Sequence, residues 1–264
     1  EDSRTISAIH RPSSVSMGPA LVTPAVEEVR AAVELDAVSR LVPNRHIAMG
    51  GMGEVTEVLD ASLLRPLAKK TLHVDLQRDA KNQRMFLREA RVTGQLEHPN
   101  IVPVHELGID AEGRIYFTMK RVEGRTVAEV VKALPHGPFV RSELLELLEV
   151  VVRVCDALAY AHARGVVHCD LKAANVMVGE FNEVYVMDWG IARVLGEATS
   201  SEGPVRDGLV SPSPESAPSI TGTPSFMAPE QARGDAAAID ARTDVFAVGA
   251  LLYEIVTGRP PYHG

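Results

Sequence analysis

The sequence has little cysteine and no long hydrophobic run. Cys155 and Cys169 are its only two cysteines, which excludes a disulfide framework and gives no metal-ligand spacing for a zinc site. No apolar stretch approaches the ~20 residues that a membrane-spanning helix needs, and the charged first residues are not typical of a signal peptide. We therefore expect a cytoplasmic chain without a membrane segment, in a reducing compartment.

An excess of basic charge is also lacking. The chain carries 35 acidic and 27 basic residues, a net charge of -8, and this balance gives no indication of general nucleic-acid binding. Its 264 residues are 45% apolar and 23% charged, which is typical of a globular protein. A chain of this length is long enough for one large domain or two lobes.

The pattern along the chain predicts four kinds of segment. Residues 1–24 mix Ser, Pro and Gly and predict a disordered tail, and residues 25–43 have the spacing of an amphipathic helix. Residues 44–123 contain short strand patterns and one helix, whereas residues 124–264 are mainly helical. Within the helical part, the Ser- and Pro-rich residues 197–220 predict a flexible loop.

The first chemical signal is a glycine-rich turn between two strands, Ile47 to Val55. Glycines allow a backbone to approach a phosphate closely and to donate N–H groups to it, although a purely structural hairpin would show the same pattern. The following strand adds Ala68 and Lys70, which share one face because alternate strand residues do. A small residue leaves space for a ring, and the ammonium suits a phosphate.

Glu89 lies inside the helix predicted over residues 80–96. Its simplest interpretation is a solvent-facing residue paired with a neighbouring arginine. The alternative is a pair with Lys70, which would hold the ammonium over bound phosphates, and phosphoryl transfer depends mainly on such positioning.

The strongest signal is an ordered set of polar residues bordered by short strand patterns: Asp170, Lys172, Asn175 and Asp188. One carboxylate can accept a proton from an attacking hydroxyl, and the lysine can neutralise a moving phosphoryl group. Asn175 and Asp188 supply the oxygen ligands that Mg²⁺ prefers. Capping residues in a polar loop would explain each member singly but not the ordered set.

Residues from about 44 to 264 resemble the protein kinases, and among them the bacterial serine/threonine kinases of eukaryotic type, because these motifs occur in the order of the general kinase template. The resemblance implies an α+β, two-lobed protein-kinase fold, with a β-rich N-lobe and a helical C-lobe truncated after the helix that contains Asp244. It also implies that Asp244 anchors the catalytic loop and that residues 197–220 are an insert in the activation segment.

The resemblance further assigns roles, residue by residue. The implied catalytic residues are Asp170, Lys172, Asn175, Lys70 and Glu89, and the implied Mg²⁺ ligands are Asn175 and Asp188. The implied ATP-binding residues come from the glycine-rich loop, the following strand, the hinge and the floor of the cleft: Ile47, Ala48, Met49, Gly50, Gly51, Met52, Gly53, Val55, Ala68, Lys70, Met119, Lys120, Val122 and Met177.

Three positions depart from the family pattern. Ala48 replaces the first glycine of the loop and should stiffen it. Cys169 replaces the arginine that receives an activation-segment phosphate, so we expect activity that does not depend on phosphorylation of Ser219 or Thr221. Trp189 replaces a phenylalanine and needs a roomier apolar slot. The other cysteine, Cys155, is expected to be a small core residue.

The leading interpretation is an ATP- and Mg²⁺-dependent serine/threonine kinase that acts on proteins, itself included. A pseudokinase-like nucleotide-binding scaffold is the alternative, and a small-molecule kinase is a weaker third. Oligomeric state stays open. We also expect Glu230 to be buried without its usual partner, because the chain stops at Gly264.

Overall fold

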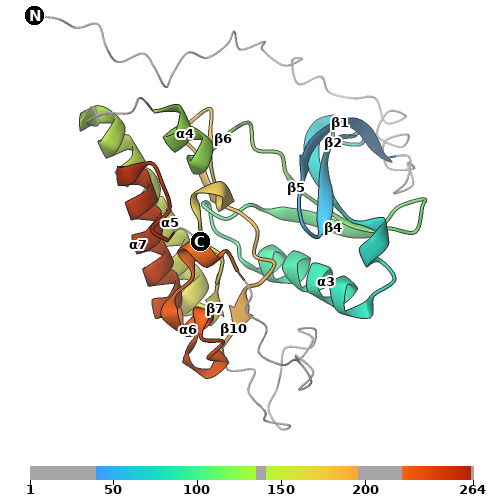
Figure 1. Ribbon diagram of the computed structural model, residues 1–264. Coiled ribbons are helices and arrows are strands. Elements are labelled where there is room, and N and C mark those ends of the chain that lie inside the picture. Colours follow the sequence, from blue (N-terminus) through green and yellow to red (C-terminus); the bar gives the residue numbers. More distant parts are fainter. Residues whose placement is uncertain (1–39, 135–140, 196–221, 263–264) are drawn as a thin grey trace, which may run out of the picture.

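The computed structural model describes residues 40–134, 141–195 and 222–262. Its described part consists of a β-sheet lobe with one helix and a lobe of helices with short strands, joined by the segment between β5 and β6 (Figure 1). The two-lobed α+β fold predicted from the sequence is therefore confirmed.

The N-terminal lobe is a five-stranded antiparallel sheet in the order β1-β2-β3-β5-β4. Its strands are β1 (Leu41–Met49), β2 (Gly53–Asp60), β3 (Arg65–Leu72), β4 (Val104–Ile109) and β5 (Ile115–Lys120). The turn between β1 and β2 requires glycine at Gly53, because a Cβ atom there would lie 2.4 Å from the carbonyl oxygen of Thr71. The glycine-rich turn is thus pressed against β3.

One face of this sheet packs on α3 (Ala80–Gln95), which follows the short 3-10 turn η1 (Val74–Leu76). Asp79 caps α3, since its side chain accepts a hydrogen bond from the Lys81 N–H at 2.9 Å. The helix buries Phe86 and Ala90 in a cluster with Phe117 of β5. This packing brings Glu89, on the same buried side of α3, toward the sheet.

The C-terminal lobe begins with β6 (Gly124–Thr126), α4 (Val127–Ala133) and α5 (Arg141–Ala163). Thr126 and Glu129 form the capping box that starts α4. The remaining elements are β7 (Val166–Val167), η2 (Ala173–Asn175), β8 (Val176–Gly179), β9 (Val184–Val186), β10 (Arg193–Val194), η3 (Pro224–Phe226), α6 (Pro229–Ala232), η4 (Ala236–Ala238) and α7 (Ala241–Thr257). β6, β8 and β9 form one small sheet, and β7 pairs with β10.

The main core lies where α5 and α7 pack together and cover the short strands. It includes Val154, Leu251 and Trp189, each no more than 1% exposed. Figure 1 shows α5 and α7 side by side, with β7 and β10 near the lower end of α5. The loop between β7 and β8, which carries the predicted catalytic residues, therefore follows a strand that packs against two long helices.

One predicted boundary is wrong. Residues 41–43, expected to end an amphipathic helix, belong to β1, where Leu41 pairs with Asp60 and Val42 with Leu59. A short apolar run is compatible with the apolar spacing of a helix and with that of a strand, and here the pairing with β2 makes these residues a strand. The expected tail over residues 1–24, the rest of that helix and the loop over residues 197–220 lie outside the described residues.

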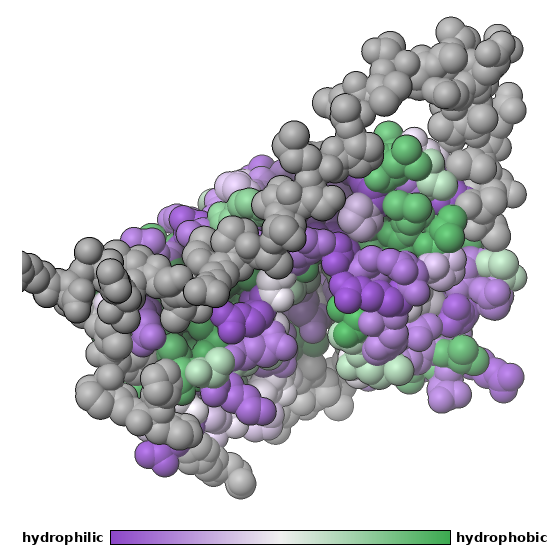
Figure 2. All heavy atoms as spheres, turned by 90° about the horizontal axis from the view of Figure 1, so that it is seen from above, coloured by the Kyte–Doolittle hydropathy of each residue, from purple (hydrophilic) through white to green (hydrophobic). Residues whose placement is uncertain are grey.

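Within the described ranges, no helix combines the length and apolarity needed to cross a bilayer. In the view of Figure 2 hydrophilic residues cover much of the described surface, and hydrophobic residues gather over the N-terminal lobe at the right. Exposed apolar side chains of that lobe include the paired Val42 and Leu59, which are 46% and 39% exposed.

Candidate active site

The loop between β7 and β8 is hydrogen-bonded to Asp244 of α7. This carboxylate is fully buried and accepts hydrogen bonds from the backbone N–H groups of His168 at 2.8 Å and Cys169 at 3.0 Å. The His162 ring nitrogen Nε2 lies 2.7 Å from the same carboxylate. The expected anchoring by Asp244 is thus seen in the structure.

His168 fixes the next turn of the loop from inside the core. Its Nδ1 accepts a hydrogen bond from the Asp170 N–H at 3.1 Å, so the proton resides on Nε2, which donates to the carbonyl oxygen of Met187 at 3.0 Å. The ring also packs on Trp189, with the centroids 4.6 Å apart. One buried imidazole therefore connects the segment of Asp170 with the segment of Asp188.

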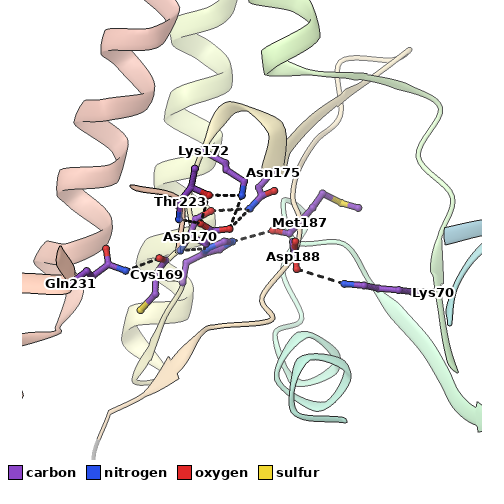
Figure 3. A network of polar contacts seen from close by, with 10 residues as sticks. Lys70, Cys169, Asp170, Lys172, Asn175, Met187, Asp188, Thr223 and Gln231 are labelled. Carbon is purple, nitrogen blue, oxygen red and sulfur yellow. Dashed lines mark hydrogen bonds and ion pairs between the residues drawn. The ribbon is translucent and has the colours of Figure 1, made fainter. Parts of the chain in front are cut away.

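Asp170 is the centre of a polar network (Figure 3). Its Oδ1 accepts hydrogen bonds from the backbone N–H of Thr223 at 2.9 Å and from the Thr223 hydroxyl at 2.8 Å. Its Oδ2 lies 2.8 Å from Lys172 Nζ and 3.3 Å from Asn175 Nδ2. Because these donors come from two segments of the chain, the fold fixes the orientation of the carboxylate. The Asp170 side chain is 15% exposed.

The two predicted metal ligands are joined through the backbone. The Met187 N–H donates to the carbonyl oxygen of Asn175 at 2.8 Å, and Asp188 is the next residue. The Asn175 side-chain nitrogen donates to Asp170, which leaves its oxygen to serve as a ligand. The Asp188 carboxylate is 50% exposed. A hard, oxygen-only pair of this kind fits Mg²⁺.

Lys70 of β3 connects the sheet, α3 and the Asp188 segment. Its Nζ lies 2.5 Å from Glu89 Oε1 and 3.6 Å from Asp188 Oδ1. The side chain of Lys70 is only 12% exposed. Burial by itself would lower the pKa of Lys70, but the two carboxylates outweigh it and raise that pKa above its ordinary value. The ammonium is therefore held charged and aimed between helix and cleft.

The predicted nucleotide-binding residues meet on one face of the sheet. In the strand register Val55 lies opposite Lys70, and Ala68 lies opposite Met119, so these four side chains share a face. Ala68 and Met119 are buried, whereas Val55 is partly exposed. Met177 follows η2 on β8 of the other lobe and is also partly exposed.

The remaining residues of the predicted nucleotide site lie in the turn and the hinge. Ala48 pairs with Val55 across β1 and β2, and the side chains of Ile47 and Met49 are exposed. Gly50 closes the turn, because its N–H donates to the carbonyl oxygen of Gly53 at 2.9 Å. Gly51 and Met52 complete the turn, and Lys120 and Val122 lie in the hinge at and just after the end of β5.

Cys169 is buried beside Asp170 but points away from the network. Burial raises the pKa of its thiol to about 12, and the nearby Asp244 carboxylate acts in the same direction. Its backbone carbonyl accepts a hydrogen bond from Gln231 Nε2 at 2.7 Å, which links the loop to α6. Independence from phosphorylation of Ser219 or Thr221 stays a prediction.

Two expectations for single residues are wrong. Cys155 is exposed on α5 rather than in the core, because the helix is apolar on more than its packed side. Glu230 is only partly buried and has a partner, since the Thr243 hydroxyl donates to it at 2.6 Å. Sequence reasoning also missed the roles of Gln231 and His162, for which the spacing gives no signal.

The chain matches the protein kinase domain model over residues 41–264. It is 39% identical over 221 residues to the probable serine/threonine-protein kinase CE0033 of Corynebacterium efficiens, covering 83% of this chain and 31% of that protein. It is 37% identical over 222 residues to the serine/threonine-protein kinase PknB of Mycobacterium tuberculosis, covering 83% of this chain and 32% of that protein.

Among solved structures, the PknI kinase domain of Mycobacterium tuberculosis superposes with a TM-score of 0.61 at 25% identity, over 86% of this chain and 78% of that one. The fold, the site and these similarities define a class, and the chain belongs to the protein kinase family. It spans about a third of the length of the bacterial serine/threonine-protein kinases that it matches. The similarities give no support to the scaffold alternative.

Proposed function

We propose that this chain is the catalytic domain of a serine/threonine protein kinase that transfers the γ-phosphoryl group of Mg²⁺-ATP to hydroxyl groups of proteins, itself included. The observation that carries the proposal is the connected set of contacts from Glu89 through Lys70 to Asp188. It joins the expected phosphate-binding lysine to the expected metal ligand across the two lobes. Cytoplasmic localisation remains part of this proposal.

The residues divide the work of transfer between them. Asp170 orients the acceptor hydroxyl and takes its proton as the oxygen–phosphorus bond forms and the bond from Pγ to the leaving ADP oxygen breaks. Lys172 lies 2.8 Å from Asp170 and offsets negative charge on the moving group. Lys70 holds the phosphates, and Asn175 with Asp188 would hold Mg²⁺, which supplies further charge neutralisation.

Thr223 favours serine or threonine as the acceptor. Its hydroxyl lies 2.8 Å from Asp170 Oδ1 and 2.7 Å from Lys172 Nζ, so it closes the network beside the reacting carboxylate. Pro224 to Phe226 form a short turn directly after it, ahead of α6. This segment is joined to Asp170 through Thr223 and suits an extended polypeptide better than a small molecule.

The test is transfer itself. We expect the chain incubated with Mg²⁺-ATP, alone or with casein, to gain mass increments of about 80 Da for each phosphate on itself or on casein. Asp170→Asn should abolish these increments while retaining ATP binding. Asp156→Asn is the matched control, because Asp156 is an exposed carboxylate on α5.

Intact-mass spectrometry reads out the modification, and calorimetry reads out ATP binding. ATP binding without any mass gain on the chain or on casein would contradict the kinase proposal and favour the scaffold alternative.

A further inference from the structure

The hinge, which begins at the last residue of β5, carries two adjacent side chains that reach in different directions. Lys120 Nζ lies 2.5 Å from the hydroxyl of Tyr185 on β9, in the C-terminal lobe. Arg121 Nε lies 2.6 Å from Glu57 Oε2 on β2, in the N-terminal lobe. The segment expected to bind the adenine edge is therefore held from both lobes by its side chains.

Glu57 is one of two buried carboxylates on β2, and Asp60 at the end of the strand is the other. The Glu57 side chain is only 8% exposed, although it is a carboxylate on a strand near the cleft. The register places it opposite Ala68, and Ala68 lies opposite Met119, so Glu57 shares the face of the sheet that carries the predicted adenine-contacting residues. A buried carboxylate at this position needs compensating donors.

Those donors come from the hinge and from β1. Asn44 Nδ2 donates to Glu57 Oε1 at 2.6 Å, and Arg45 Nε donates to Glu57 Oε2 at 2.9 Å. Asn44 and Arg45 belong to β1, the strand that leads into the glycine-rich turn, and Arg121 belongs to the hinge. Oε1 is therefore bound by Asn44 of β1, whereas Oε2 is shared between Arg45 of β1 and Arg121 of the hinge.

We propose that Glu57 is a positioning residue for the nucleotide: by pairing with Arg121 it fixes the hinge against the β1–β2 ribbon and so sets the width of the adenine site. The geometry gives a reason why this carboxylate is buried. A pair of arginines around one carboxylate is rigid and directional, because guanidinium donors form a planar fork. The inference deepens the proposed function, on which it rests.

The expected effect separates binding from chemistry. Neither Glu57 nor Arg121 contacts Asp170, so Glu57→Gln and Arg121→Gln should each raise the KM for ATP about three- to tenfold, as expected for losing a charge-assisted pair, and leave kcat within about twofold.

Both variants remove the Glu57–Arg121 pair. Each also changes a second set of contacts, since Glu57 accepts from Asn44 and Arg45 and Arg121 also pairs with Glu123. The double variant should therefore raise the KM by less than the product of the two single effects. Arg121→Lys, which keeps the charge, should restore part of the loss.

Asp110→Asn is the matched control. Asp110 is also a carboxylate with a side chain only 7% exposed, paired with Arg114 at 3.0 Å, but it lies in the turn between β4 and β5. We expect it to lower the melting temperature without changing the KM for ATP. An equal rise in KM for Asp110→Asn and Glu57→Gln, or additive effects in the double variant, would overturn the inference.

The measurement also works without transfer. Calorimetric dissociation constants for ATP should show the same pattern across the wild type and these variants. If the wild type transfers no phosphate but the pattern in binding holds, the proposed function fails and the positioning role stands. If Glu57→Gln does not fold, the Arg121 variants and the control decide the matter; unchanged ATP affinity in Arg121→Gln would then overturn it.

Discussion

Asp170 and Cys169 are adjacent in the chain, yet their side chains meet opposite environments. Asp170 is 15% exposed and surrounded by donors, whereas Cys169 is buried and its thiol lies 3.6 Å from the Val167 carbonyl oxygen. The positive φ of Cys169, 67°, turns the chain between the two residues. The turn directs the carboxylate to the cleft and the thiol to the interior.

This difference predicts unequal reactivity of the two cysteines. With a pKa of about 12, only about one Cys169 in ten thousand is a thiolate at pH 8, and burial limits access further. Burial and the neighbouring Asp156 also raise the pKa of Cys155, but that residue is exposed. We expect iodoacetamide at pH 8 to alkylate Cys155 and to leave Cys169 unmodified.

Peptide mass spectrometry after timed labelling checks this prediction. The thiolate is the reactive form. The rate of labelling of Cys169 should therefore rise about tenfold for each unit by which the pH increases toward its pKa, while the chain stays folded. Labelling in urea, where both cysteines should react, is the control. Equal rates at pH 8 in the folded chain would show that Cys169 is an accessible thiolate, against the structure.

At the scale of elements, α7 holds the loop between β7 and β8 through a single carboxylate. Asp244 lies in the first turn of α7, where a negative charge is favourable, and accepts from two consecutive backbone N–H groups of the loop. Packing of α7 against α5 and β7 keeps the carboxylate in place. The loop geometry is therefore transmitted from a buried helix.

Asp244→Asn should be strongly destabilising. The amide retains one acceptor oxygen, and its NH₂ group then faces a buried N–H donor, so the free energy of unfolding should fall by about 2–4 kcal/mol. The kcat should fall as well, because the loop that carries Asp170 loses its anchor. Chemical denaturation and initial rates measure the two effects.

Asp240→Asn is the control in the same helix. Asp240 is the partly exposed N-cap of α7, and asparagine caps a helix about as well. A comparable loss of stability in both variants would argue against a special role of Asp244.

At the scale of the whole molecule, the two lobes meet at the predicted nucleotide site. Lys70 belongs to the sheet lobe, Asp188 to the segment after β9, and Asn175 to η2. Their side chains converge in Figure 3 on the region between the lobes. A ligand that contacts all three would stabilise both lobes together, since binding to the folded state alone favours that state.

We therefore expect Mg²⁺-ATP to raise the melting temperature. At about 100 times its dissociation constant, a ligand adds about 2.7 kcal/mol of stability, which corresponds to several degrees for a chain of this size. Chelation of Mg²⁺ with EDTA should remove most of the shift. Asp188→Asn should do the same while leaving the melting temperature without nucleotide nearly unchanged, because Asp188 is half exposed.

Differential scanning fluorimetry measures these shifts. An equal shift with and without Mg²⁺ in the wild type would contradict the assignment of Asn175 and Asp188 as metal ligands.

Much of the fold and site could be predicted because the informative residues are close in sequence. Asp170, Lys172 and Asn175 lie within six positions, and their order carries the chemistry without any tertiary information. The side of the strand on which Lys70 lies could be predicted as well, because alternate strand residues share a face and Ala68 is two positions away. The sequence allows two interpretations of Glu89, a solvent-facing residue or a partner of Lys70, and only the packing of α3 decides for the pair with Lys70.

Other features depend on contacts between distant segments. The pairing of Leu41 with Asp60 decided a strand where the local pattern allowed a helix. Exposure of Cys155 depends on which side of α5 meets the core, and the apolar composition of that helix does not define a single side. Thr223 reaches Asp170 across 53 positions, a distance over which spacing carries no signal.

The sequence by itself determined the chemistry available to this protein, because residue type and local spacing set which groups can hold phosphate, bind Mg²⁺ or accept a proton. Only the tertiary structure decided the arrangement: that Asp244 anchors the loop, that His168 joins Asp170 to Met187, and that Glu57 pairs with Arg121. These partners lie on different elements, so their contacts arise only when the lobes pack. Local patterns specify elements, whereas burial and long-range pairing specify which side chains meet.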